Sequence, residues 1–356
     1  MAAFLLLPLP ASAAEDTEER LADMLQLKRL EEEAEDTGIG RYGSVLSGVD
    51  TEGFLLELLS GAARAVVSKE LLRDLGAVLV TVLLCGAAKT AAVPTGSRFD
   101  AVSAAGAAAV TLLLAGGQDS LAVRLEQAVF RLQDVANVLL PMLGTTAFLS
   151  GQVTAAAAKY AAAAWFFNVL VNLSSTFVLP TVRIYIAAAA AEAAVGGSVL
   201  GGVLGFLKWC VTAALTCLVL AFTLFLSLSS LTGNAADAAA VRSAKTAIST
   251  MLPVVGSIAG DAASALLAAA SVIRQSVGIF GLLTVTGVLL LPFLQAGARY
   301  LLLKGAAAVS AGLTDERLSC LLRRMGEASA MLLGCLGACA LLLFFTVYSF
   351  MGASAL

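Results

Sequence analysis

The chain has 356 residues, of which 59% are hydrophobic and only 13% are charged, and its formal net charge is −3. A soluble domain carries about 25% charged and about 45–50% apolar residues, so an ordinary soluble protein is excluded. No basic stripe is present to neutralise phosphates, which argues against a nucleic-acid-binding protein. The chain has no histidine and no phosphate-binding loop motif. We therefore expect no enzyme, no catalytic residue, no metal and no cofactor.

The N-terminal part predicts two segments that precede the membrane domain. Residues 1–14 are typical of a signal peptide, because a short apolar core is followed by the small residues Ala11, Ser12 and Ala13. Residues 15–74 form an acidic extracytoplasmic region whose leucines are spaced like one helical stripe. Two interpretations of this helical arm stay open: a docking arm, or a solvated face that rests on the membrane surface.

Residues 75–356 contain apolar blocks of the length that crosses a hydrocarbon core of about 30 Å as a helix. The alternating pattern of a membrane β-barrel is absent, so we predict an all-α, polytopic helical membrane protein. Eight spans are expected, at residues 75–93, 101–116, 136–149, 161–179, 200–228, 250–271, 277–296 and 328–350. Residues 119–134 mix leucines with charges and are expected to lie in the membrane interface as an amphipathic helix. Seven spans result if residues 250–271 only dip into the membrane.

Basic residues then orient the spans. With the acidic region outside, the inner loops contain Lys89, Arg98, Lys159, Arg242, Lys245, Arg299, Lys304, Arg317, Arg323 and Arg324. The outer loops contain Arg124, Arg131, Arg183, Lys208 and Arg274. This excess of inner positive charge favours an eight-span arrangement with the C-terminus outside.

Small residues recur every four positions in two stretches, Gly197, Gly201 and Gly205 and then Gly256 and Gly260. This interval lets two helix backbones approach closely. Packing within one chain and self-association into a homo-oligomer both remain open. Cys335 and Cys339 are one helical turn apart. No third ligand is nearby, so we interpret them as packing residues and not as a metal or redox pair.

A charged helix is expected just inside the membrane, on the cytoplasmic face. Its residues Asp237, Arg242 and Lys245 share one broad helical face. Pro253 then interrupts the backbone hydrogen bonds near the start of the next helix.

Asp261 lies about midway through the span predicted at residues 250–271. A charge at that depth costs about 2.5–3.5 kcal/mol, so its side chain should face protein or water. We hold Asp261, with Pro253, Gly256 and Gly260, as a candidate intramembrane site. The alternative is a structural ion pair between Asp261 and Arg274, or between Asp261 and a basic group of another helix.

Residues 241–283 resemble the stage III sporulation protein AE family of endospore-forming bacteria. The matching elements are Arg242-Ser-Ala-Lys245, Leu252-Pro-Val-Val-Gly256, Asp261-Ala, Val277-Gly278, Gly281-Leu282 and, further upstream, Asn172-Leu-Ser. The layout of a signal peptide, an acidic extracytoplasmic region and a set of membrane spans is similar to the family as well.

The resemblance implies a multi-pass subunit of the transenvelope channel or secretion complex between mother cell and forespore, which endospore development needs. It implies a place in the mother-cell membrane around the forespore, the outer forespore membrane. The implied partners are the other stage III sporulation A-operon proteins, including a cytoplasmic ATPase, and indirectly stage II sporulation protein Q. We expect contact with membrane lipid and none with nucleic acid.

Two other functions stay open from the residues alone. One is a stand-alone transporter or permease with an intramembrane site at Asp261, although no convincing internal repeat supports it. The other is a membrane scaffold that recruits partners and conducts nothing.

Overall fold

The computed structural model describes residues 101–195, 200–251, 256–313 and 316–352, together with scattered positions between 73 and 87. Every regular element in these ranges is helical, and five helices are long and apolar enough to cross a membrane. The predicted all-α, polytopic membrane class is therefore confirmed. The predicted signal peptide, most of the acidic region, Gly197 and Pro253 lie outside the described residues.

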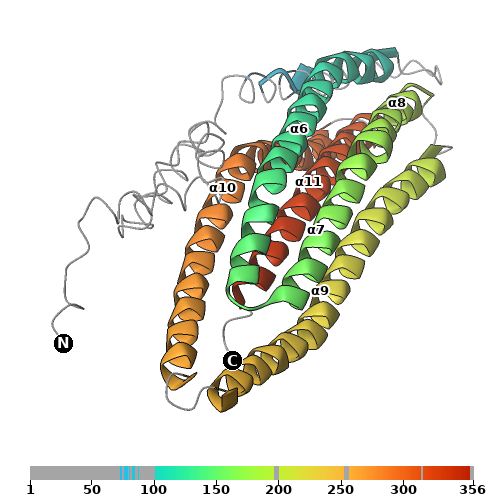
Figure 1. Cartoon of the computed structure of the whole chain (residues 1–356). Helices are drawn as coiled ribbons and strands as arrows, with labels where there is room; N and C mark the ends of the chain where they lie inside the picture. The colour runs from blue at the N-terminus through green and yellow to red at the C-terminus, as the bar shows by residue number, and fades with distance from the viewer. Residues whose placement is uncertain are drawn as a thin grey trace.

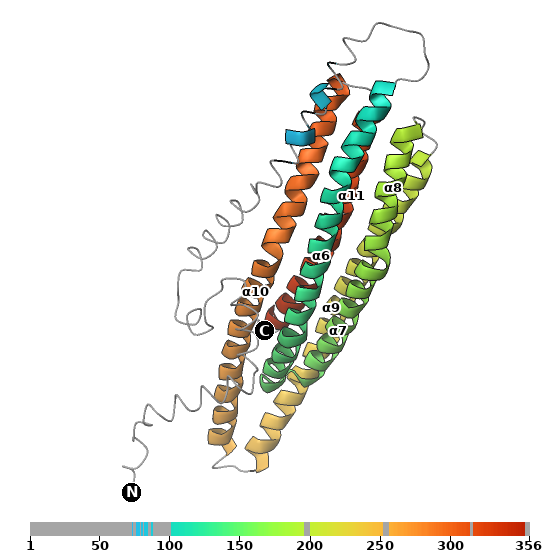
Figure 2. The same ribbon diagram turned by 90° about the horizontal axis from the view of Figure 1, so that it is seen from above.

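Five helical rods build the described bundle, as Figures 1 and 2 show. The first is α6 (Ala101–Leu149), and the second joins α7 (Val153–Leu173), the π-helix η1 (Ser174–Val178) and α8 (Leu179–Val195). The others are α9 (Gly201–Met251), α10 (Gly256–Leu313) and α11 (Glu316–Met351). The connections between rods are short, so successive rods run antiparallel.

The bundle has two ends, which we name by their connections. The proximal end holds the α8–α9 and α10–α11 connections, and the distal end holds the α6–α7 and α9–α10 connections. The rods are much longer than a hydrocarbon core: the 58 residues of α10 span about 87 Å. At the distal end, α9 and α10 extend past the α6–α7 connection (Figure 1). The bundle therefore has parts that lie beyond the membrane.

The predicted division into separate short spans is wrong at two places. The blocks at residues 101–116, 119–134 and 136–149 form one uninterrupted helix, α6. Residues 256–271 of the block at 250–271 lie in the same helix, α10, as the block at 277–296. No interfacial helix exists at residues 119–134, because its leucines pack into the core. A hydropathy window averages over all faces of a helix, so it reads a charged outer face as a break.

Helix α11 lies at the centre of the bundle and contacts α6, α7, α8, α9 and α10. Its leucines 321, 322, 332, 336, 342 and 343 are buried, and so are Cys335 and Cys339. The Sγ atom of Cys335 lies 3.0 Å from the Oγ atom of Ser174 on η1. Within the described residues, no group of three potential ligands surrounds this pair.

The π-helix η1 lets the second rod pass Pro180 without breaking. In a regular helix, proline removes a backbone N–H and its ring clashes with the carbonyl four residues earlier. A π turn absorbs this conflict by local widening. The hydroxyls of Ser174 and Ser175 donate hydrogen bonds to the carbonyls of Leu170 and Val171, at 2.7 and 3.2 Å. These bonds satisfy carbonyl groups in the turn before the widened segment.

Gly233 is the residue that allows α9 to approach α7 closely. A Cβ atom added there would lie 2.8 Å from the Cα and Cβ atoms of Ala155. The predicted small-residue stretch behaves differently, because a Cβ atom at Gly205 would meet nothing within 4 Å and one at Gly201 would meet only side chains. Packing between backbones of one chain, one of the two roles left open for that stretch, is therefore not found at these two positions.

We expect Gly233→Ala to destabilise the bundle by about 1–3 kcal/mol, because the added methyl group has no room against the α7 backbone. Gly205→Ala is the matched control: it lies on the same helix and gains the same helix propensity, but it meets open space. Thermal unfolding of both variants in detergent, followed by circular dichroism, measures the difference. Equal unfolding temperatures for the two variants would contradict the close contact.

Candidate functional site

Four rods share a long uncharged stretch. These stretches are residues 160–182, 209–236, 275–298 and 328–351, and we call the layer they form the apolar slab. Each stretch is long enough to cross a hydrocarbon core of about 30 Å as a helix. Charged and polar groups gather at both boundaries of the slab, and these two collars contain the candidate site.

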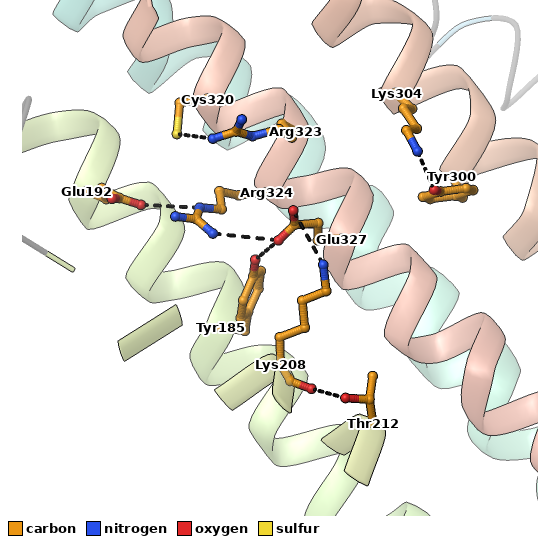
Figure 3. Close-up of polar contacts among 10 residues, drawn as sticks. All are labelled: Tyr185, Glu192, Lys208, Thr212, Tyr300, Lys304, Cys320, Arg323, Arg324 and Glu327. Carbon is orange, nitrogen blue, oxygen red and sulfur yellow. Dashed lines mark hydrogen bonds and ion pairs between the residues drawn. The ribbon is translucent and has the colours of Figure 1, made fainter. Parts of the chain in front are cut away.

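The proximal collar is centred on Glu327 of α11 (Figure 3). The hydroxyl of Tyr185, on α8, donates a hydrogen bond of 2.6 Å to Oε2 of Glu327, and Nζ of Lys208, on α9, lies 3.5 Å from Oε1. Arg324, one turn before Glu327, lies 3.6 Å from it through NH1. The Nε atom of the same arginine lies 3.5 Å from Oε2 of Glu192 on α8. One network therefore joins three rods.

The charges of this network balance, with two cations and two carboxylates. The exposed fraction of the side chains is 9% for Glu192, 16% for Arg324, 23% for Glu327 and 42% for Lys208. Gly201 provides space for it, since a Cβ atom there would lie 3.3 Å from both Arg324 and Glu192. A neutral, mostly buried network of this kind fixes the relative positions of helices.

Helix α6 joins the same collar through Gln118, which is fully buried. Its Nε2 atom donates hydrogen bonds to the carbonyl of Met325, at 3.2 Å, and to Oγ of Ser329, at 3.0 Å, both on α11. At the surface, Arg183 of α8 lies 3.4 Å from Asp119 of α6. The exposed ion pair adds little stability. The buried hydrogen bonds of the Gln118 side-chain amide fix the axial position of α6 relative to α11.

The distal collar contains a carboxylate on one rod that caps the N-terminus of a helix on another rod. The two Oδ atoms of Asp237, on α9, accept hydrogen bonds of 2.9 Å from the backbone N–H groups of Thr154 and Ala155. These groups belong to the first turn of α7, whose own N-cap residue, Gln152, makes no side-chain capping bond. A carboxylate at this place satisfies otherwise unpaired N–H groups and complements the helix dipole. Asp237 and Gly233 are one turn apart on α9, and both contact the first turn of α7.

Two cations are buried beside this cap. Lys159 of α7 is 1% exposed and Arg274 of α10 is fully buried. The Nζ atom of Lys159 donates a hydrogen bond of 2.9 Å to the carbonyl of Ser349, and NH1 of Arg274 donates one of 3.1 Å to Oγ of Ser150. Together with Asp237, they close the distal boundary of the apolar slab.

The predicted charged face on α9 is divided by the structure. Asp237 is buried at the α7 cap, whereas Arg242 is exposed, and the side chain of Lys245 is not among those described. The two described side chains therefore face different surroundings.

Asp261 lies in the same continuous helix as Arg274, with Gly256 and Gly260 in the first turns. The thirteen residues from Asp261 to Arg274 correspond to about 20 Å along the helix axis. The pairing of Asp261 with Arg274 is therefore wrong, because no side chain bridges that distance.

The predicted split of basic residues into inner and outer loops is also wrong. Lys208 and Arg324 were expected on opposite sides, yet both contact Glu327. Lys159 and Arg274 were also expected on opposite sides, yet both lie at the distal end. The cause is α10, a single helix that crosses the slab once, whereas two crossings were predicted there. The loops that follow residue 250 therefore lie on the side opposite to the predicted one, relative to the loops between α6 and α9.

Sequence reasoning did not single out Tyr185, Glu192 or Glu327. Tyr185 and Glu327 are 142 residues apart, so no local pattern joins them. One signal was available: Glu192 and Lys208 are isolated charges within apolar segments, and such charges face protein or water.

These features define a polytopic α-helical membrane protein whose rods are tied together by a polar collar at each end of an apolar slab. The sequence model of stage III sporulation protein AE matches residues 100–354, which cover all five rods. The chain belongs to this family, as the resemblance at residues 241–283 predicted. No curated protein and no solved structure gives a match.

We expect Tyr185→Phe and Glu327→Gln each to destabilise the bundle by about 1–3 kcal/mol, because the first removes the hydroxyl that donates to Glu327 and the second removes the negative charge that strengthens this bond and pairs with Lys208 and Arg324. The double variant should lose less than the sum, with a coupling free energy of about 0.5–3 kcal/mol. A double-mutant cycle of unfolding in detergent measures this coupling. Glu316→Gln, at an exposed position of the same helix, is the control. Additive losses would show that the two groups do not interact.

Proposed function

We propose that this protein is an integral membrane subunit of the mother cell–forespore transenvelope channel or secretion complex that endospore development requires. The match to the stage III sporulation protein AE family across residues 100–354 carries the proposal. The five long apolar helices support a multi-pass protein of the mother-cell membrane around the forespore. In this role the chain is no enzyme and needs no cofactor, and energy for transport comes from a partner.

The distribution of basic residues supports an orientation for the complex. The proximal end carries Arg183, Lys208, Arg299, Lys304, Arg317, Arg323 and Arg324, whereas the distal end carries Lys159, Arg242, Lys245 and Arg274. Because cytoplasmic ends of membrane proteins are enriched in lysine and arginine, the proximal end faces the mother-cell cytoplasm. A cytoplasmic ATPase, among the other stage III sporulation A-operon proteins, would then meet the bundle there.

The distal end supports contact with extracytoplasmic partners. Beyond Asp237 and Arg274, the last turns of α9 and the first turns of α10 form a helical hairpin that continues about 20–27 Å past the collar. This hairpin holds Arg242, which is exposed, and the backbone of Asp261. It is suited to dock against partners in the space that faces the forespore, including, indirectly, stage II sporulation protein Q.

The orientation predicts opposite labelling at the two ends in intact cells. A cysteine at Gly312, which is exposed at the proximal end, should be protected from a membrane-impermeant thiol reagent until the membrane is permeabilised. A cysteine at Arg242, which is exposed at the distal end, should react at once. Mass-tag gel shifts against the unmodified chain measure both. Immediate labelling at position 312 with protection at position 242 would invert the orientation.

Membership of the complex predicts specific neighbours of the distal hairpin. A photo-crosslinking amino acid at Arg242, introduced in sporulating cells, should yield adducts with other stage III sporulation A-operon proteins by mass spectrometry. The matched position Leu224, exposed on α9 within the apolar slab, should yield no such adducts. Adducts at neither position would contradict the complex and favour a stand-alone transporter or a scaffold outside the complex.

We also expect Asp261→Asn to lower spore yield at a normal protein level, and an unchanged yield would remove Asp261 from the functional residues.

A further inference from the structure

Helix α6 exposes a polar stripe along its outer face. Arg124, Gln127, Arg131, Asp134 and Asn137 are all exposed and recur at intervals of three or four residues, with Val123 and Phe130 exposed among them. This interval places them on one side of the helix. The opposite side, which includes Leu125, Leu132 and Leu139, is buried in the core.

Two contacts fix the depth of this stripe against α10. Near the proximal collar, Gly117 of α6 lies against the guanidinium of Arg299, and further along α6 the side chain of Leu139 lies against Gly281. Between Gly281 and Arg299, α10 carries no charged residue. The α6 stripe therefore runs alongside the apolar slab, and Arg131 and Asp134 lie near its middle.

Exposure to lipid at this depth is costly for such residues. A charged side chain at the centre of a membrane helix costs about 2.5–3.5 kcal/mol on insertion scales, and α6 exposes both Arg131 and Asp134 there. The outer face of α9 at the same level shows what a lipid-facing surface of this bundle contains: Leu220 is 57% exposed and Leu224 is 64% exposed. The α6 stripe differs from that surface and fits water.

A strip one helix wide on a single chain does not enclose water, so a second wall must complete it. The stripe carries both signs of charge within one turn, at Arg131 and Asp134. Copies that share one membrane orientation bring Arg131 of one chain near Asp134 of the next, which is favourable for self-association around a common centre. We propose that α6 lines a water-filled path for hydrophilic solutes, walled by the α6 helices of several copies of this chain.

Such a path would give the proposed channel function a physical route through the membrane. The inference rests on the proposed function only where it places the bundle in the complex. Rings of charged side chains and water-filled lumens are the usual means by which membrane proteins pass polar solutes. Both signs at the middle of the stripe favour a path without strong preference for anions or cations.

Water access is tested by thiol labelling of the full chain in lipid vesicles. In Gln127→Cys, the new thiol lies about 14 Å along α6 from Gln118, at the proximal collar, and the native Cys217 lies about 14 Å along α9 from Lys208, in the same collar. Cys217 is exposed on the lipid-facing side of α9, so it is an internal control at matched depth. We expect a charged methanethiosulfonate reagent to modify position 127 at least ten times faster than Cys217, as site-resolved mass spectrometry measures. Equal rates would overturn the water-filled path.

Asn137→Cys provides a second exposed position on the stripe if the variant at position 127 does not fold. The second copy is tested by oxidative crosslinking of the same variants, which should give a species of twice the monomer mass. Fast labelling without that species would show that water reaches the stripe without a second copy, and it would overturn the assembly of copies. These experiments use the purified chain, so they can fail while the crosslinks to sporulation proteins in cells stand, and the reverse also holds.

Discussion

Hydrocarbon offers a helix neither water nor hydrogen-bond partners, and the arrangement of charge in this bundle follows from that constraint. Four rods carry no charge across the apolar slab, and the groups at its boundaries are paired from different rods. Glu327 gathers Tyr185, Lys208 and Arg324 at the proximal boundary, while Asp237 gathers the N-terminus of α7 at the distal one. Each collar therefore pairs polar groups from different rods and holds those rods in register at the same time.

Packing of the rods between the collars depends on close approach of the helices. Lipid chains are as apolar as leucine, so the hydrophobic effect does not drive helices together within the membrane. Helix α11 contacts the other described rods through a broad buried face, and at Gly233 no side chain separates α9 from α7. The cap made by Asp237 is one turn away from Gly233, so it requires that close contact. Steric fit and polar satisfaction are thus linked at the distal end.

The α6 stripe is the place where the constraint is not met by one chain. Arg131 and Asp134 are exposed alongside the uncharged part of α10, although the other rods keep such residues at the boundaries. In the proposed role as a subunit of a channel or secretion complex, this polar surface would be completed on assembly. The distal hairpin continues past the collar and is separate from the α6 stripe.

The sequence by itself determined the membrane class, the all-α fold and the family, because these depend on composition, on the length of apolar runs and on local motifs such as those of residues 241–283. Only the tertiary structure decided where the helices are continuous, and therefore on which side each loop lies. The breaks predicted around residues 119–134 and 272–276 rested on charges that the fold accommodates, on an outer face for Arg131 and in a buried contact with Ser150 for Arg274. A hydropathy average over a sequence window does not distinguish the outer face of a helix from its buried face. The partners of Glu327 and Asp237 are separated from them by 80 residues or more, except for the neighbouring Arg324. No local pattern encodes such pairings, which exist only once the rods are packed.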